Sequence, residues 1–450
     1  MQISSVRQNL LRICAAVAVI VIVLLPFHAF LTVWLSSLIG HYTLLRLWKE
    51  YLVLLIGLVS VWQILFNAKT RRAFWHSRLM WLIVAYAALD LVLGGIAFGM
   101  HHVSARALAY GLLDDLRFLV FFVICWVLVY SGKRLDRHWV RLIIWPALIV
   151  IVFGLLEMLV LPANFLSHFG YGPATILPYQ TINNNVHYIR ILSTLRGADP
   201  LGAYLLLPLS ALGVMLVRRP RSWNWLKILL IIAALAVLYG SYSRAAWVGA
   251  VLAALLILAA SIDPALIRRF RKPLVVAVVV LLVAAGGIFI ALKHSDKFQN
   301  IIFHTQTHSA SAVSSDQAHL SALTQGVDQL IKYPFGLGAG TSGPASVYNH
   351  DHHPRITENY YLEIGEESGW LGMLLFLAIT VGVACLLWQR RDSPLALTLL
   401  AAFVGIAFIN LLTLAWTDDT LCYIWWGLAG AALALPPRWP DNRSSETVTR

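Results

Sequence analysis

Long apolar runs recur along almost the whole chain, and they limit what it can fold into more than any other feature. A run of about 20 apolar residues can cross the ~30 Å hydrocarbon core of a bilayer as a helix, and no water is present there to satisfy a non-helical backbone. Hydrophobic residues make up 59% of the chain and charged residues only 12%, which excludes a soluble globular protein. We therefore predict an all-α integral membrane protein, with residues 1–450 forming a single polytopic domain.

The pattern predicts about 12 transmembrane helices. The first run is too long for a signal peptide and has no small-residue cleavage site before a polar region, so we interpret it as a retained helix. The predicted spans are 11–38, 51–67, 79–99, 112–131, 141–161, 200–217, 225–241, 245–262, 273–292, 367–388, 395–415 and 420–436.

Lys and Arg gather in alternate loops, which fixes the predicted orientation. Segments 68–78, 132–141, 218–221, 268–272 and 389–392 carry most of them. Basic short loops face the cytoplasm, so an even helix number also places both termini there. The net charge of +13 then reflects topology and attraction to anionic lipid, and the scattered basic residues do not indicate nucleic-acid binding. All four cysteines fall inside predicted spans, so neither a disulfide nor a thiolate metal site is indicated.

Two long segments, 162–199 and 293–366, fall on the non-cytoplasmic side. Loops of this length are usually functional or disordered, and these are rich in aromatic and apolar residues. Within the second, apolar residues at helical spacing predict an amphipathic helix that ends before Pro334 and lies on the membrane surface or packs against the bundle. The following GLGAGTSG (336–343) could bring backbone N–H groups to a phosphate or could be a flexible turn.

Two arginines lie at helix ends on the predicted non-cytoplasmic side, where the bias of basic residues toward the cytoplasm would not place them. Arg190 precedes a predicted helix, and Arg244 lies in the short turn SYSR between two others. Arginine at membrane depth usually marks a ligand path or a paired site, and its guanidinium matches phosphate oxygens bidentately. The alternative is that each side chain reaches the lipid head groups. Arg117 is a further possible phosphate contact.

The segment YNHDHHPRITENYYLEIGEESGW (348–370) combines titratable residues with the start of an apolar run. Neighbouring His352 and His353 cannot easily bind one ion and no HExxH motif is present, so we predict no metal site and no other cofactor. From Thr357 onward the pattern is helical, which places Glu358 near a helix N-terminus, where the helix dipole favours an ionised carboxylate. Glu358 could be a general base or a capping residue.

Four segments resemble the bacterial O-antigen ligase and polysaccharide polymerase superfamily. RILSTLRGADPLGAYLLL resembles its arginine-led segment, although Ala198-Asp199 stands where Pro-Asn is usual. LYGSYSRAAWVGA is similar to its Ser-Arg turn and YPFGLGAG to its Pro-x-Gly-x-Gly loop. ENYYLEIGEESGWLG is similar to its His-Asn-x-x-Leu segment. The similarity covers roughly residues 180–390.

This resemblance implies a GT-C-type helical fold with a large periplasmic loop between helices 9 and 10. It further implies metal-independent, inverting transfer of a glycan from undecaprenyl diphosphate to a sugar hydroxyl, at the periplasmic face of the inner membrane. Arg190 and Arg244 match the arginines assigned to the donor diphosphate. Glu358 matches the position where ligases carry their proposed base histidine, and His352 or His353 could supply an imidazole instead. Further contacts are expected from loop and helix-start residues, namely Gly338, Gly340, His350, Asn359 and Tyr361.

Glutamate at position 358 favours a polymerase, in which the acceptor is another lipid-linked glycan, over an O-antigen ligase that uses the lipid A core. A small-solute transporter is the alternative from another class. Transporters usually place charged residues at the membrane midplane and have repeated halves, whereas only Asp90 and Glu157 would lie near the midplane here and no internal repeat is evident. A non-catalytic partner in a polysaccharide export complex is a third hypothesis.

Overall fold

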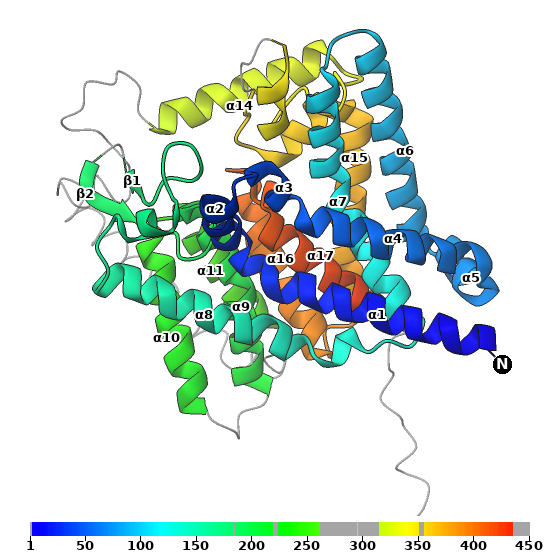
Figure 1. Cartoon of the computed structure of the whole chain (residues 1–450), viewed down its shortest axis with the longest axis horizontal. Coiled ribbons are helices and arrows are strands. Elements are labelled where there is room, and N and C mark those ends of the chain that lie inside the picture. The colour runs from blue at the N-terminus through cyan, green and yellow to red at the C-terminus, as the bar shows by residue number, and fades with distance from the viewer. Residues whose placement is uncertain are drawn as a thin grey trace, which may run out of the picture.

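In the computed structural model the described residues are 2–182, 185–218, 224–261, 295, 315–350 and 355–434. Almost all of their regular structure is helical (Figure 1). The α-helices are α1 (Gln2–Leu24), α2 (His28–Ile39), α3 (Tyr42–Arg46), α4 (Trp48–Phe66), α5 (Ala68–His76), α6 (Arg78–Gly99), α7 (Ala105–Tyr130), α8 (Trp139–Leu159), α9 (Ala198–Arg218), α10 (Asn224–Gly240), α11 (Arg244–Ser261), α14 (Ser315–Lys332), α15 (Tyr360–Gln389), α16 (Pro394–Ile409) and α17 (Asp419–Leu433). Short 3-10 helices are η1 (Leu25–Phe27), η2 (Leu135–Arg137), η3 (Phe165–Phe169), η5 (Pro344–Tyr348) and η6 (Ala415–Thr417).

The predicted all-α membrane protein is confirmed in its main features. A helix lies at each predicted span except 273–292, which falls outside the described residues. Among the described residues, seven helical segments are long and apolar enough to cross a membrane, and α10 and α16 are shorter apolar helices. The total of twelve spans, the GT-C arrangement and the boundaries of the two outside loops stay predictions.

Two helices differ from the predicted spans because of single residues. The span 11–38 is divided by η1, since Pro26 cannot donate the next helical hydrogen bond and the chain turns there before α2 begins. Helix α15 is kinked at Gly369, whose φ of 68° lies in the left-handed region. Gly369 also lies so close to the backbone of Phe335 that a side chain would not fit.

The core is built around α17, which is apolar on all sides and buried along almost its whole length. It packs chiefly against α7, while the neighbouring α16 packs against α9 and α11 (Figure 1). Trp416, Trp425 and Trp426 are fully buried together, and the Trp425 indole N–H donates to the Leu399 carbonyl. Helix α6 packs against both α7 and α15.

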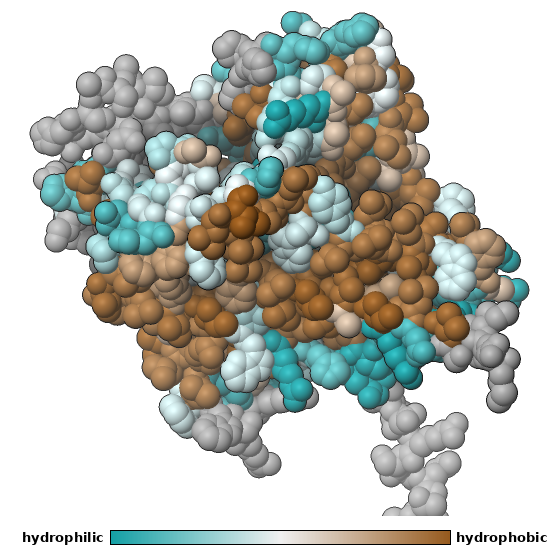
Figure 2. Space-filling model, in the orientation of Figure 1, coloured by the Kyte–Doolittle hydropathy of each residue, from teal (hydrophilic) through white to brown (hydrophobic). Residues whose placement is uncertain are grey.

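The face of the molecule shown in Figure 2 has an apolar band with polar residues above and below it. Helix α14 lies across one end of the bundle and packs against α15 (Figure 1). It ends at Lys332, two residues before Pro334, as the sequence predicts. Its Leu330 is buried against the bundle, whereas Leu320, Val327 and Ile331 are exposed.

The outside segment 162–199 contains a small hairpin that the sequence did not predict. Strands β1 (Gln180–Ile182) and β2 (Asn185–Arg190) pair antiparallel, with Gln180 opposite Arg190. Strands this short give too weak a pattern to be recognised among the polar residues of a long loop. The hairpin matters because it delivers Arg190 to the end of α9.

Candidate functional site

The structure brings the segments of Arg190 and Arg244 together. The Arg190 Nε donates to the carbonyl of Ser241 at 2.9 Å, and the next backbone N–H, of Ile191, donates to Gly240. Ser241 and Arg244 are three residues apart, so their Cα atoms are separated by at most about 11 Å. Arg190 also forms an ion pair of 2.7 Å with Asp199 in the first turn of α9. Both arginines are partly buried.

The loop between Arg190 and α9 is held firmly from several sides. The Ser193 N–H donates to the Glu157 carboxylate at 2.6 Å, and the Ser193 hydroxyl donates to the Val150 carbonyl. The Thr194 hydroxyl donates to the Pro26 carbonyl. Glu157, an acid that the sequence places near the membrane midplane, therefore fixes this loop in place.

Left-handed backbone conformations gather in the segments that carry the motifs. Five non-glycine residues of the described structure have positive φ, and three of them are Ser193 (52°), Tyr242 (50°) and Glu358 (54°). Each lies in a different motif segment. Left-handed conformations are unfavourable for L-residues, persist only where the surroundings enforce them, and are concentrated at functional sites. These three segments are thus marked by conformation as well as by sequence.

Glu358 lies two residues before the first residue of helix α15 and is not its cap. The N-cap is Asn359, whose side-chain oxygen accepts from the Leu362 N–H at 3.0 Å, so the capping role considered for Glu358 belongs to its neighbour. The Asn359 amide donates to the Leu411 carbonyl, and the Tyr360 N–H donates to the Asn410 carbonyl. The Tyr361 hydroxyl donates to the Ala407 carbonyl of α16. The Glu358 segment is therefore fixed on the end of α16 and the loop that follows it.

The same loop, residues 410–418, continues to a second arginine of the first motif. Arg196 forms an ion pair of 3.0 Å with Asp418 and donates to the Thr417 hydroxyl. Arg117 on α7 donates to the Thr417 carbonyl from the buried side. Loop 410–418 thus contacts the Glu358 segment at one end and the Arg196 loop at the other.

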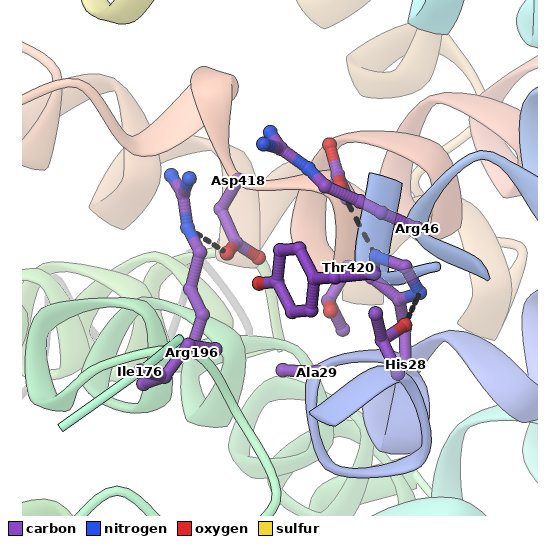
Figure 3. Close-up of a pocket in the computed structure, with 10 residues that line it drawn as sticks. His28, Ala29, Arg46, Ile176, Arg196, Asp418 and Thr420 are labelled. Carbon is purple, nitrogen blue, oxygen red and sulfur yellow. Dashed lines mark hydrogen bonds and ion pairs between the residues drawn. The ribbon is translucent and has the colours of Figure 1, made fainter. Parts of the chain in front are cut away.

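A cavity of about 210 Å³ opens beside Arg196 (Figure 3). Arg196 enters it from the loop before α9, and Arg46 enters it from α3. The view also shows Asp418 beside Arg196 and His28 at the opposite side. The lining residues are His28, Ala29, Thr32, Tyr42, Arg46, Ile176, Arg196, Asp418, Asp419 and Thr420.

A buried cluster of charged residues lies behind this cavity. Asp419 forms ion pairs with Arg117 and with Lys49, the latter at 3.0 Å, and its carboxylate lies 3.5 Å from the ring of His28. Arg117 also pairs with Asp114 at 3.0 Å, and Lys49 pairs with Glu50 at 2.9 Å. Buried charges inside a membrane protein are expensive unless paired, and they usually mark functional sites.

Arg46 lies at the edge of this cluster. Burial lowers the pKa of its guanidinium, but the carboxylates of Asp419 and Asp114 together outweigh this effect and hold its pKa above the ordinary value. Arg46 is therefore a permanent cation facing the cavity. Sequence analysis did not select Arg46, Arg196 or Asp419 as site residues, because each resembles an ordinary charge at a helix end. Arg117, the predicted phosphate contact, lies one layer behind the cavity wall.

The glycine-rich loop surrounds a carboxylate of the protein itself. The N–H groups of Gly340 and Ser342 both donate to the Glu367 Oε1, at 2.9 and 3.0 Å. Gly340 has a φ of +85° and packs against the backbone of Ala107 on α7. Close packing explains the glycine there. The phosphate contact by Gly338 and Gly340 stays a prediction; the Gly340 N–H donates to the Glu367 carboxylate and the Gly338 N–H donates to the Glu367 carbonyl.

A second cavity, of about 500 Å³, lies between α14, the glycine-rich loop and the segment before Glu358. Ile356 and Thr357 contribute to its wall, so it extends close to Glu358. His350 is exposed nearby in sequence. His352 and His353 lie outside the described residues, so their predicted catalytic role stays a prediction. Among the residues that are described, no group of three or more His, Cys, Asp or Glu could hold a metal ion.

Comparison with known proteins gives one match. Residues 228–377, one third of the 450-residue chain, match the family model described as O-antigen ligase. The matched region runs from α10 to the middle of α15 and includes Arg244, the glycine-rich loop and Glu358. Arg190 and the Arg46–Arg196 cavity lie outside it. No curated protein matches the chain. Over this third of the chain the match confirms the predicted resemblance to the O-antigen ligase and polysaccharide polymerase superfamily.

Proposed function

We propose that this protein is a membrane glycosyltransferase that moves a glycan from an undecaprenyl-diphosphate-linked donor to a sugar hydroxyl at the periplasmic face of the bacterial inner membrane. The family match supports an O-antigen ligase or polymerase type of function in surface polysaccharide synthesis. In this proposal both termini are cytoplasmic, because the basic loops are. The partners are the lipid-linked donor, the glycan acceptor and the bilayer, and no cofactor takes part.

One observation carries the proposal: three motif segments with left-handed residues are joined through direct contacts and loop 410–418. Arg190 binds the backbone of the Ser241 turn, Arg196 binds Asp418, and the Glu358 segment binds Asn410. Residues that are more than 200 positions apart in the chain are thereby held in one region. A transporter would not require this gathering of strained loops around two arginine segments.

In the proposed reaction the acceptor hydroxyl oxygen attacks the anomeric carbon of the donor from the face opposite the diphosphate. Glu358 accepts the hydroxyl proton as general base, a bond forms between this carbon and the acceptor oxygen, and the bond to the diphosphate oxygen breaks. The electron pair leaves with the diphosphate, so the configuration is inverted. Arg190 and Arg244 stabilise the charge that develops on the leaving group. Metal ions are not needed in this scheme because guanidinium groups supply the positive charge.

Arg117 has a supporting part in this scheme. Its guanidinium is engaged by Asp419, Asp114 and the Thr417 carbonyl. It therefore holds loop 410–418 from behind and acts on the diphosphate only through the residues in front of it. His350, Asn359 and Tyr361 remain proposed contacts near the start of α15.

The test is transfer activity of the purified protein with a lipid-linked donor. If Glu358 is the base, Glu358→Gln should lower the rate by about 10²- to 10⁴-fold, and Glu358→His should keep part of the activity because imidazole can accept the proton. Asp392→Asn, which changes an exposed acid on a basic loop far along the chain, is the matched control. Wild-type rates in a well-folded Glu358→Gln variant would contradict the assignment.

A deletion strain separates the two acceptors. A polymerase predicts loss of long-chain glycan while single repeat units remain attached to the cell surface, which is the outcome we expect. Loss of every glycan from the lipid A core would instead indicate an O-antigen ligase. Unchanged surface glycans would refute both.

A further inference from the structure

We propose that the cavity between Arg46 and Arg196 binds a phosphate group of a lipid-linked substrate, in addition to the contacts assigned to Arg190 and Arg244. This assignment of the ligand rests on the proposed function, whereas the anion site itself rests on geometry and charge. Neither Arg46 nor Arg196 belongs to the region matched by the O-antigen ligase family model.

The cavity is lined by groups that suit an anion with several oxygen atoms. Arg46 and Arg196 come from separate parts of the chain and both reach the cavity (Figure 3). The hydroxyl-bearing residue Tyr42 lines it as well, whereas the Thr420 hydroxyl donates to the Leu25 carbonyl and the Thr32 hydroxyl is hydrogen-bonded to the His28 ring. Guanidinium groups bind phosphate through two parallel hydrogen bonds, and a tyrosine hydroxyl can donate to a remaining oxygen. With about 210 Å³, the cavity has room for a phosphate or diphosphate but not for a whole oligosaccharide.

The acidic residues of the cavity are already neutralised by the protein. Asp419 is paired with Lys49 and Arg117. Asp418 is paired with Arg196 and also caps α17, because its carboxylate accepts from the Leu421 N–H. Each of these two carboxylates is therefore bound to at least one cation, although Lys49 is shared with Glu50 and Arg117 with Asp114.

Arg46 is the cation that lacks such a partner. Within the described structure no carboxylate lies close enough to its guanidinium, 4.0 Å or less, to form an ion pair. The guanidinium stands over the ring of Tyr110, 6.0 Å from the ring centroid. Its side chain is nevertheless partly buried. The carboxylates of Asp419 and Asp114 stabilise its charge from beyond ion-pair distance and offset its loss of hydration, but they form no hydrogen bond with it. A phosphate bound in the cavity would add a close counter-ion and could accept two hydrogen bonds from this side chain.

The position of the cavity connects it to the proposed reaction. The loop 191–197 connects the two sites: Arg190 immediately precedes it, and Arg196 lies near its C-terminal end. Asp418, which fixes Arg196, ends the loop on which the Glu358 segment is held. A phosphate group on Arg46 and Arg196 would therefore lie next to the elements that hold both candidate diphosphate arginines and the candidate base.

Direct binding measurements test the site without requiring turnover. The full-length protein is placed in nanodiscs of phosphatidylcholine only, and binding of undecaprenyl diphosphate is compared for wild type, Arg46→Ala and Arg46→Lys. We expect Arg46→Ala to weaken binding by about ten- to hundredfold, as for loss of a charge-assisted hydrogen-bonded pair, and Arg46→Lys to weaken it less. Arg106→Ala is the matched control, because Arg106 is exposed and stands over the same Tyr110 ring at 6.0 Å but does not line the cavity.

The outcomes discriminate between sources of the phosphate. Competition by undecaprenyl phosphate but not by phosphatidylglycerol supports a lipid-linked substrate, whereas equal competition by phosphatidylglycerol would assign the cavity to a bilayer head group and overturn the substrate assignment. Wild-type affinity in Arg46→Ala, with a loss only in Arg190→Ala, would overturn the site altogether. A wild-type protein that binds but never transfers glycan would refute the proposed function and leave the anion site standing.

Discussion

Replacing Glu367 tests whether a carboxylate of the protein, and not a bound phosphate, organises the glycine-rich loop. In Glu367→Ala the buried N–H groups of Gly340 and Ser342 lose the oxygen to which both donate, at 2.9 and 3.0 Å. Each unsatisfied buried donor costs about 1–3 kcal/mol, so the variant should lose about 2–6 kcal/mol of stability. Water that enters the space left by the side chain could accept from these N–H groups, so the loss of stability would then lie toward the lower end of this range.

Glu367→Gln is the discriminating control. Its amide oxygen can still accept from Gly340 and Ser342, and its NH₂ group can donate to the carboxyl group of the neighbouring Asp115. We therefore expect the glutamine variant to melt close to wild type in detergent, and the alanine variant to melt several degrees lower. Equal melting temperatures for all three proteins would refute the reasoning. Stabilisation of the alanine variant, but not of the wild type, by added pyrophosphate would instead indicate that the freed N–H groups of the loop can bind phosphate.

Two further substitutions probe close packing and the buried charges. Gly340→Ala should destabilise the protein by about 1–2 kcal/mol, because alanine is unfavourable at the left-handed φ of +85°. The loss should be larger still, because the added methyl group would collide with the Ala107 carbonyl. The control is Gly95→Ala, whose new methyl group has no atom within 4 Å, and it should melt like wild type or slightly higher. A normal melting temperature for Gly340→Ala would mean that the loop does not pack as described. Asp419→Asn removes the charge shared by Lys49 and Arg117, and breaking a buried pair should cost about 3–5 kcal/mol, seen as a lower melting temperature and reduced yield. Unchanged stability would show that the cluster is hydrated in the membrane.

The membrane helices could be predicted because hydrophobic length alone defines them. Two further features could be predicted from the sequence. Proline chemistry predicted that α14 ends before Pro334, and the family resemblance predicted that the Arg190 and Arg244 segments meet. The break at Pro26 illustrates the limit of hydropathy. The run 11–38 stays predominantly apolar on both sides of Pro26, and only the missing backbone donor of proline indicates that the helix stops there.

The candidate cavity could not be predicted, since its residues come from unrelated parts of the chain. Lys49, Arg117 and Asp419 each resemble a charge that marks a helix end, and only the packing of α4, α7 and α17 reveals that they neutralise one another. Similarly, the glycine-rich loop has the composition of a phosphate loop. Its acceptor, Glu367, lies 27 residues beyond Gly340, where no local pattern could identify it.

Thr417 links the buried charges to the cavity and gives the cluster a reason to exist. Its carbonyl accepts from Arg117 and its hydroxyl accepts from Arg196, so a single residue joins the interior cation to the cation at the cavity wall. A buried ion pair seldom adds net stability compared with apolar packing, but it does fix side chains in one arrangement. Here the fixed arrangement includes the loop on which both Arg196 and the Glu358 segment are held. The cluster thus positions groups that never touch it, which accounts for the presence of so many charges at this depth in an apolar protein.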